Sequence, residues 1–441
     1  MTEAGTGPLP AAALEATKQH ILDTFAAMVS GSELAPGLFA IKFARAHSAE
    51  KTATVAASDV VCGAIEAAFS NAMLAHSDET DDSHAPSESH PGASVVPAAL
   101  ACGEQFNIDG PRFLRAVALG YDVGTRVTMT IGVGGFQTAT HISTHALAGT
   151  FGSAAAAGCA ASLNQQQMRW LIDYASQQAS GIKTWQRDTD HIEKAFLFAG
   201  MPARNGVTAA LLVQDGATGV DDVLSGQDNF LLDYAPQADP GKLIDKLGER
   251  YEITRTNIKK WTVGSPIQAP LDALELILKR RAIDADQVQT VTVRVASSEA
   301  ALVNNREMPD ICMQYMIAVM LLDKTASFKA AHDKPRMQDA AVLKQRAKVQ
   351  LVLDAELERQ LPARVAIVEV ALVDGTRLTE TVKAVRGTAE NPMPREEVIA
   401  KCRDLMTPVL GADRCSKLID TTLNIESLKS IRALRPLLQR T

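Results

Sequence analysis

The stretch Asn71–Ala101, NAMLAHSDETDDSHAPSESHPGASVVPAALA, joins two runs of small apolar residues through a loop rich in acids and histidines. The flanking runs are typical of buried helices, and Pro86 and Pro91 mark the polar loop between them. The ionisable side chains of the loop are His76, Asp78, Glu79, Asp81, Asp82, His84 and His90. Ionisable groups held between hydrophobic walls can have their pKa values tuned for proton transfer. We therefore predict a proton-transfer site here.

Two other interpretations of this loop are open. Its acids and histidines could bind a metal ion, but the segment has no HxxxH or HExxH spacing and no EF-hand pattern. It could also be an acidic loop in solvent. The apolar helices on both sides favour a buried site, and we expect no metal.

The composition is that of a globular, mainly helical protein. At 441 residues the chain is long enough for two or more domains. Apolar residues make up 46%, with alanine dominant and aromatics at only 5%, which favours closely packed helices. The formal net charge is −7. This mild acidity argues against general binding of nucleic acid or of a membrane surface.

Cysteine spacing and the apolar runs point to a cytoplasmic protein. The six cysteines are scattered, with no CxxC, as expected for small buried residues in a reducing compartment. The first residues show no basic start followed by an apolar core, so no signal peptide is expected. Gly or charged residues break the apolar runs before about 18 residues, and we expect no membrane partner.

Helical patterns dominate the first part of the chain. Leu14–Gly31 carries apolar residues on one helix face. Further helices are predicted over 58–75, 93–103, 111–130 and 168–181. The segment that follows His145 is nearly all Ala and Gly, so a neighbouring helix could approach it closely. We predict an all-α domain over residues 1–265.

Strand patterns begin only after Trp261. Gln287–Val295 alternates polar and β-branched residues. Arg364–Val373 and Thr376–Ala384 flank an Asp-Gly pair and indicate a β-hairpin. We predict a smaller α+β domain over 266–395, then C-terminal helices over 396–441 that return to the all-α domain. The expected fold class is mainly α.

Two further groups of residues could complete a site. His141 and His145 precede the Ala/Gly-rich helix, whose N-terminus would attract a carboxylate, although both could be structural. Lys194 and Arg204 bracket an apolar stretch and would suit an anionic substrate. No GxGxxG after a strand, P-loop or GxSxG is present. Nucleotide-binding and serine-hydrolase chemistry therefore have no support.

Taken together, these motifs resemble the MmgE/PrpD family. The matching segments follow one another in the family's order over nearly the whole chain. They are AHSDETDDSH at 75–84, SHP at 89–91, TFGSAAAA at 150–157, AGMPARNG at 199–206, the segment 259–273, and NPMPREEVIAK at 391–401. Each motif is weakly specific alone, and the ordered set is strong.

The resemblance implies a fold and a type of reaction. The family contains 2-methylcitrate dehydratase, cis-aconitate decarboxylase and iminodisuccinate epimerase. Its members have a large helical and a smaller α+β domain, usually form homodimers, and use neither a metal nor an organic cofactor. Their site lies between the domains and binds small di- or tricarboxylates. All three reactions transfer a proton at the carbon beside a carboxylate.

The motifs also imply site residues. We expect catalytic roles for His90, Asp81 and Lys194, and for one of His141 and His145, which both precede the Ala-rich helix. The expected substrate-binding residues are Glu79, Asp82, Ser83, His84, Arg204, Lys259, Trp261 and Gln268. The chain departs from the family pattern at several of these positions.

The departures bear on the chemistry. The residues found here where the family has another type are Glu79 for Asp, Ser83 for Thr, Ala195 for Lys, Phe198 for His, Trp261 for Tyr and Gln268 for His. Losing a tyrosine hydroxyl and a histidine weakens the case for expelling hydroxide, which needs a general acid. An epimerase needs only bases on opposite faces of the carbon.

Three functions follow as hypotheses. The favoured one is a cofactor-independent lyase, a dehydratase or decarboxylase, acting on a small di- or tricarboxylate. The second is an epimerase of an amino- or imino-dicarboxylate that uses His90 and one of His141 and His145 as opposed bases. The third is a carboxylate-binding protein without catalysis.

Overall fold

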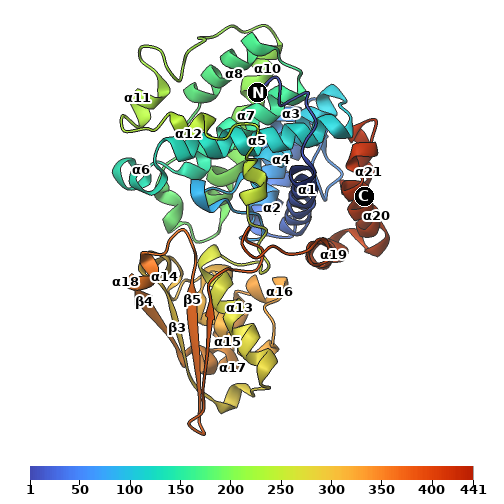
Figure 1. Cartoon of the computed structure of the whole chain (residues 1–441). Coiled ribbons are helices and arrows are strands. Elements are labelled where there is room, and N and C mark those ends of the chain that lie inside the picture. Colours follow the sequence, from blue (N-terminus) through green and yellow to red (C-terminus); the bar gives the residue numbers. More distant parts are fainter. Residues whose placement is uncertain (441) are drawn as a thin grey trace. The chain divides into compact units, whose positions relative to one another are not determined.

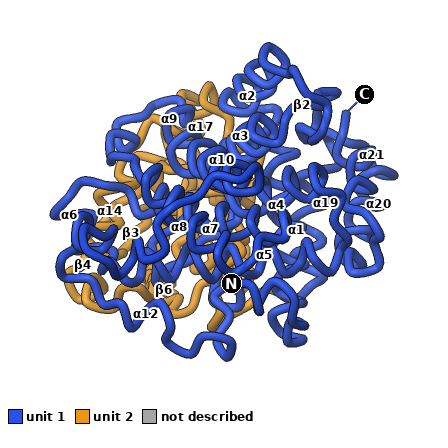
Figure 2. Tube along the Cα trace, turned by 90° about the horizontal axis from the view of Figure 1, so that it is seen from above, with its two compact units in different colours: residues 1–77, 81–256, 394–441 blue, residues 78–80, 257–393 orange. Residues whose placement is uncertain are grey.

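A computed structural model describes residues 1–440 and divides them into two compact units. Unit 1 comprises residues 1–77, 81–256 and 394–440, and unit 2 comprises residues 78–80 and 257–393 (Figure 2). The chain changes unit at 256/257 and 393/394, whereas the expected domain boundaries were 265/266 and 395/396. The sequence also gave no sign that 78–80, inside the acidic loop, belong with unit 2.

Unit 1 consists mainly of helices joined by short turns and loops (Figure 1). The helices are α1 (Ala11–Gly31), α2 (Ala35–Ala46), α3 (Ala64–Ala75), α4 (Pro91–Phe106), α5 (Gly110–Thr130), α6 (Val133–Thr140), α7 (Thr144–Ala160), α8 (Gln165–Gln177), α9 (Ile192–Ala195), α10 (Met201–Gln214), α11 (Phe230–Tyr234), α12 (Gly241–Ile244), α19 (Arg395–Leu410), α20 (Ala412–Leu423) and α21 (Arg435–Leu438). A π-helical turn, Phe196–Gly200, joins α9 to α10.

Helix α7 lies at the centre of unit 1, packed against α4, α5 and α10. Small residues make this possible. A Cβ atom added to Gly124 of α5 would lie 2.2 Å from the carbonyl oxygen of Ala148 in α7, and one added to Gly206 of α10 would lie 2.4 Å from the amide nitrogen of Ala154. The Ala/Gly-rich segment therefore does what its composition predicts, and α7 holds its first turn, with His145, in a fixed place.

One helical stretch, Ile192–Gln214, is long and apolar enough to cross a membrane by length and composition. No such run was expected, because Gly or charged residues break the apolar runs of the sequence. Within the protein, 72% of its most apolar window is buried. Its α10 part packs against α3, α4 and α7, as a core helix does.

Unit 2 is built on a four-stranded sheet with the order β4-β3-β5-β6. Strand β3 (Val288–Ala296) pairs in parallel with β4 (Val349–Asp354) and antiparallel with β5 (Ala366–Leu372), which continues into β6 (Arg377–Val382). The remaining helices are α13 (Ser265–Arg280), α14 (Ser297–Val303), α15 (Met313–Asp323), α16 (Phe328–Ala331), α17 (Ala340–Arg346) and α18 (Ala355–Glu358).

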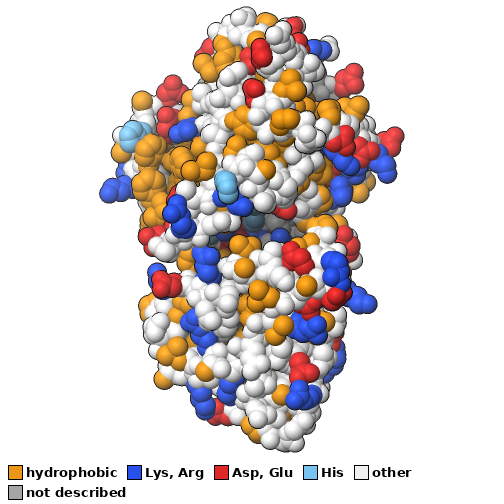
Figure 3. Space-filling view, turned by 90° about the vertical axis from the view of Figure 1, so that its left-hand side faces the viewer, with side chains coloured by type: hydrophobic (Ala, Val, Ile, Leu, Met, Phe, Trp, Pro, Cys, Tyr) orange, Lys and Arg blue, Asp and Glu red, His pale blue; other side chains and the backbone are white. Residues whose placement is uncertain are grey.

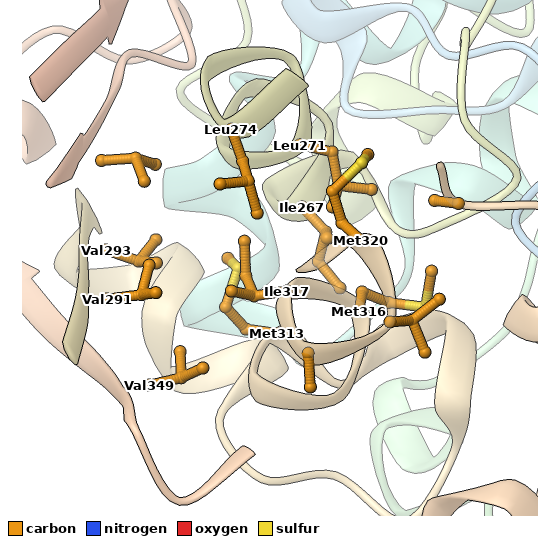
Figure 4. Close-up of a cluster of buried hydrophobic side chains, with 14 of the residues drawn as sticks. Ile267, Leu271, Leu274, Val291, Val293, Met313, Met316, Ile317, Met320 and Val349 are labelled. Carbon is orange, nitrogen blue, oxygen red and sulfur yellow. The ribbon is translucent and has the colours of Figure 1, made fainter. Parts of the chain in front are cut away.

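The core of unit 2 fills the space between the sheet and the helices α13 and α15 (Figure 4). Val291 and Val293 of β3 point toward Leu274 of α13 and Ile317 of α15, and all four are essentially inaccessible to solvent. The alternation that predicted β3 reflects this arrangement, since its intervening residues face the other way. Unit 2 thus has a hydrophobic core of its own.

The predicted fold class, a large helical part with a smaller α+β part, is confirmed. One local expectation was wrong, and one strand was missed. Helix α3 begins at Ala64 rather than near Ser58, because the residues before it form a two-stranded ribbon, β1 (Ala53–Thr54) with β2 (Val61–Cys62). Strand β4 was not predicted. On the face shown in Figure 3, basic and acidic side chains are interspersed, in keeping with the small net charge.

Candidate active site

Four histidines meet in unit 1, each at or next to a helix end. His76 ends α3, His90 precedes the first turn of α4, His145 lies in the first turn of α7, and His191 precedes α9. The ring centroid of His76 lies 5.1 Å from that of His90 and 5.2 Å from that of His191. The ring centroids of His90 and His145 lie 5.3 Å apart. We call these four residues the histidine cluster. His76 belongs to the loop predicted as a proton-transfer site but was given no role, and His191 was not predicted.

Asp81 joins two members of the histidine cluster through one oxygen. Its Oδ2 lies 3.0 Å from Nδ1 of His76 and 3.1 Å from Nδ1 of His90. The Asp81 side chain is fully buried. An ionised carboxylate only accepts hydrogen bonds, so Nδ1 of each imidazole donates to Asp81, and His90 thereby presents Nε2 as a base. Asp81 and His90, predicted as catalytic, therefore lie together.

Asp82 has a structural position. Its Oδ2 lies 2.7 Å from Nδ1 of His20 and accepts a hydrogen bond from the Tyr121 hydroxyl, while its Oδ1 accepts from the backbone N–H of Gly92 at 3.0 Å. A Cβ atom at position 92 would lie 2.5 Å from the Tyr121 hydroxyl, so glycine is needed there. Burial and the Asp82 charge raise the pKa of Tyr121 far above its usual value. Asp82 thereby fixes the start of α4, and with it His90.

His84 is held inside the same loop. Its Nδ1 lies 2.8 Å from the Ser87 hydroxyl, and its Nε2 lies 3.3 Å from a Glu252 carboxylate oxygen. Burial lowers the pKa of His84 even though Glu252 works against it. Burial would raise the pKa of Glu252, but hydrogen bonds from His84 and Arg250 outweigh it and bring the value to about 2. The predicted substrate-binding role of His84 has no geometric support, because both of its nitrogens have protein partners.

The structure also separates the two candidate histidines before α7. His145 lies beside His90, whereas His141 is exposed at the end of α6, in a left-handed backbone conformation with φ of 59°. Arg204 lies on the exposed side of α10, where its guanidinium donates to the side-chain oxygen of its neighbour Asn205. His141 and Arg204 are therefore not part of the histidine cluster. Ser83 is buried beside Asp82 in the chain.

Phe198 fills the middle of the histidine cluster. Its ring stacks on His145 at 3.8 Å and on His76 at 4.7 Å between centroids, and Trp185 meets its edge at 4.8 Å. The phenylalanine lies in the π-helical turn, a distortion often found at functional sites. Lys194 Nζ lies 5.2 Å from the centre of this ring. The site in unit 1 thus combines imidazole bases, an apolar wall and one cation.

The other predicted residues belong to unit 2. Lys259 Nζ donates to the backbone oxygen of Glu79 at 2.9 Å and contacts its carboxylate at 3.2 Å, and both side chains are buried. Trp261 donates from its indole to Asp272 at 2.9 Å. Gln268 accepts from the backbone N–H of Trp261 and donates to its carbonyl, at 3.1 and 2.7 Å. The polar groups of Trp261 and Gln268 therefore lock the turn that precedes α13.

His332, which was not predicted as a site residue, holds the same segment as Lys259. Its Nε2 lies 2.9 Å from an Asp78 carboxylate oxygen, and Asp78 also accepts from the backbone and hydroxyl of Thr80. Burial would lower the pKa of His332, but the hydrogen bond and the charge of Asp78 outweigh burial and raise it. The segment 78–80, which directly precedes Asp81, is thus fastened within unit 2 by two ion pairs.

A metal ion could be held by His76, Asp81 and His90, because each offers a ligand atom within 4.8 Å of the others. Nitrogen and carboxylate ligands of this kind suit zinc and similar ions. The same nitrogen–oxygen distances are those of ordinary hydrogen bonds, which account for the geometry without an ion.

Comparison with known protein families identifies the family to which the chain belongs. Residues 2–242 match the MmgE/PrpD N-terminal domain, and residues 261–426 match the MmgE/PrpD C-terminal domain. The chain belongs to the MmgE/PrpD family. This confirms the resemblance seen in the motifs, and the two matched regions account for most of the sequence.

Two curated proteins with sequence similarity to this MmgE/PrpD chain come from fungi. Cis-aconitate decarboxylase of Aspergillus terreus (strain NIH 2624 / FGSC A1156) is 24% identical over 471 residues, covering 98% of this chain and 93% of the relative. Cis-aconitate decarboxylase-like protein oryM of Aspergillus oryzae (strain ATCC 42149 / RIB 40) is 23% identical over 479 residues. The match covers 99% of this chain and 95% of the relative. The likeness therefore extends over both units at low identity.

Proposed function

We propose that this MmgE/PrpD protein is a cofactor-independent lyase that acts on a small di- or tricarboxylate. The observation that carries the proposal is the buried carboxylate of Asp81, bound to Nδ1 of His90 at 3.1 Å. A histidine oriented in this way presents Nε2 as a base, and the carboxylate stabilises the imidazolium that forms when the base takes a proton. The arrangement supports proton transfer at a substrate carbon.

His90 would act as a base in a dehydration and as an acid in a decarboxylation. In a dehydration, His90 takes the proton from the carbon beside a carboxylate, and hydroxide leaves from the next carbon. In a decarboxylation, the bond to the departing carboxylate breaks, CO₂ leaves, and the electron pair left on the substrate takes a proton from His90. Either path builds up negative charge beside a carboxylate. Lys194, held next to Phe198, is the cation of unit 1 suited to stabilise it.

The relatives support a lyase of carboxylates and leave the substrate open. They are named for decarboxylation of cis-aconitate, and they match this chain almost end to end. Identity of 23–24% does not carry their substrate to this chain. Phe198 and Gln268 stand where the family pattern has histidine, and Trp261 where it has tyrosine. We therefore infer a substrate other than methylcitrate.

A second candidate is an epimerase of an amino- or imino-dicarboxylate. The observation that favours it is a second imidazole, His145, whose ring centroid lies 5.3 Å from that of His90. Two bases that approach one carbon from different sides could remove the proton on one face and return it on the other. The loss of a family histidine at Phe198 also removes a group that a dehydratase would use as an acid.

Proton NMR in D₂O separates these functions. The protein is incubated with citrate, cis-aconitate, methylcitrate, malate and iminodisuccinate, each in turn. Loss of CO₂ or new alkene signals support the lyase, whereas deuterium at the α-carbon with stereochemical scrambling supports the epimerase. Silence across the panel, with thermal shifts produced by the ligands alone, would overturn both and favour a binding protein.

Replacing His90 tests the assignment of the base. We expect His90→Ala to lower kcat by about 10²–10⁴-fold, the usual contribution of a general base. The melting temperature should change little, because the imidazole lies at the edge of the buried region. His47→Ala is a matched control, since His47 is exposed and lies outside the histidine cluster. Turnover retained in His90→Ala would remove His90 from this role.

A further inference from the structure

His76 is the most deeply buried member of the histidine cluster, and neither the family motifs nor the proposed reaction gives it a task. Its relative exposure is 0%. Its ring stacks on Phe198 with an interplanar angle of 17°, and its Nδ1 lies 3.0 Å from Oδ2 of Asp81. The orientation of the imidazole is thus set from two sides. A side chain held this firmly can act on its neighbours through a hydrogen bond.

The hydrogen bond of His76 ends on the same oxygen that His90 uses. Oδ2 of Asp81 lies 3.0 Å from Nδ1 of His76 and 3.1 Å from Nδ1 of His90. A carboxylate oxygen that accepts two N–H donors has part of its charge compensated before His90 takes a proton. It therefore stabilises the His90 imidazolium less than an oxygen reserved for His90 would. The shared oxygen should make the proton on His90 easier to return.

The burial of His76 shows which form of its ring takes part. Among residues 1–440, Nε2 of His76 has no hydrogen-bond partner, and it is shielded from solvent. A charged imidazolium would leave an N–H there without an acceptor, which is costly in a buried site. The neutral ring, with its proton on Nδ1, avoids that cost. His76 is therefore suited to be a permanent donor to Asp81 and not a second base.

We propose that His76 is a positioning residue that shares the Asp81 carboxylate with His90 and thereby sets how readily His90 takes up and returns the substrate proton. This inference rests on the proposed function of His90 as the base. The titratable groups around the pair include Asp81, which binds both rings, His145 beside His90, His191 beside His76, Glu79, which has a carboxylate oxygen within 4.8 Å of a His76 ring nitrogen, and Lys194 above Phe198. Because those groups remain in a His76 variant, a change in pH dependence reports on the lost donor.

The test compares two amide replacements of similar polarity. The side-chain N–H₂ of His76→Asn can lie where Nδ1 lies, so it can still donate to Asp81. The longer His76→Gln places its N–H₂ near the former Nε2 and loses that bond. We expect His76→Gln to lower kcat by about 10–100-fold, as removal of an orienting partner does. KM should stay within about twofold, and His76→Asn should recover most of the rate.

The sign of the pH effect is fixed by the same argument. Without the second donor, Asp81 stabilises the His90 imidazolium more strongly, so His90 stays protonated to higher pH. The limb of the kcat/KM profile that His90 controls is the acid limb where His90 acts as a base and the alkaline limb where it acts as an acid. That limb should therefore move up by on the order of one pH unit in His76→Gln and stay in place in His76→Asn. Equal profiles for the two variants, or a rate loss with an unmoved limb in His76→Gln, would reduce His76 to a structural residue and overturn the proposal.

A measurement without turnover separates this proposal from the proposed reaction. The His90 ring can be followed by NMR as a function of pH in the wild-type protein and in both variants, with melting curves to check folding. A His90 titration that moves up in His76→Gln supports the shared carboxylate even if no substrate in the panel reacts. A His90 titration that does not move in His76→Gln overturns the proposal, even if the enzyme is active.

Discussion

At the scale of the residue, Phe198 decides the character of the site in unit 1. It stands between the rings of His76 and His145 and is 2% exposed. An aromatic ring in this place separates two polar imidazoles with an apolar surface and leaves no room for water between them. Where the family pattern has a histidine, this chain has a spacer that makes the rest of the histidine cluster drier. Stronger electrostatic interactions follow from a drier site.

Phe198→Ala should therefore cost stability as well as activity. The substitution leaves a cavity between two rings that are themselves held by helix ends. We expect the free energy of unfolding to fall by about 3–5 kcal/mol, as for other buried phenylalanines. Urea denaturation measures the loss, with Phe39→Ala as control because Phe39 of α2 is 45% exposed. Similar losses for the two variants would mean that the ring stack contributes little.

The sequence predicted part of this site for a clear reason. His90 and Asp81 lie in one loop, so their proximity depends on local chain geometry. The contact of His145 with His90 comes from packing of α7 against α4, which spacing cannot show, and His141 remained an equal candidate. His76 was part of the predicted loop but was given no role, and His191 was missed, because the position of each depends on where α3 ends and α9 begins. Gln268 and Trp261 were read as site residues, but their polar groups bind each other or Asp272.

At the scale of the element, the close approach of α5 and α7 makes a sharp prediction. A methyl group at Gly124 would lie 2.2 Å from the Ala148 carbonyl oxygen, so the helices must move apart. We expect Gly124→Ala to lower the free energy of unfolding by about 1–3 kcal/mol or more. Gly135→Ala in α6 is the matched control, because no atom lies within 4 Å of its added Cβ. That variant should gain about 0.5–1 kcal/mol from helix propensity, and a neutral Gly124→Ala would contradict the packing.

The hydrophobic pattern of the sequence predicted those elements in which each face keeps the same environment, buried or exposed, along the whole element. Strand β3 alternates because one of its faces meets α13 and α15, and the β5–β6 hairpin carries an Asp-Gly turn with Gly375 at φ of 84°. Strand β4 lies at the edge of the sheet, with Val352 and Leu353 exposed, so its sequence does not alternate clearly. The ribbon of β1 and β2 has two residues in each strand, too few for any periodicity.

The ion pair between His332 and Asp78, which holds residues 78–80 in unit 2, predicts that stability depends on pH. The pKa of His332 is raised in the folded protein by Asp78, so protonation of His332 stabilises the fold. This contribution is complete below the unfolded value of about 6.5 and is lost as the pH rises through the folded value. The melting temperature of His332→Gln should therefore lie further below the wild type at pH 6 than at pH 8.5. His47→Gln is the control, and an equal difference at both pH values would exclude the ion pair as the cause.

At the scale of the whole molecule, the two units differ in how the chain builds them. Unit 1 needs residues from both ends of the chain, since α19 packs against α1 and Lys401 binds Asp23 at 2.6 Å. Unit 2 is one continuous segment, 257–393, apart from residues 78–80. A continuous segment with its own sheet and core has the features of a domain that can fold alone.

We expect the fragment 257–393 to unfold cooperatively, because the core between the sheet and helices α13 and α15 lies within it. The fragment lacks Asp78 and Glu79, so His332 and Lys259 lose the partners that hold the segment 78–80. Its melting temperature should therefore not show the His332-dependent fall between pH 6 and pH 8.5 that the intact chain shows. Circular dichroism melts of the fragment with and without His332→Gln measure this. A fragment without a cooperative transition would mean that this core is insufficient, and a persisting His332-dependent fall would mean that Asp78 is not its origin.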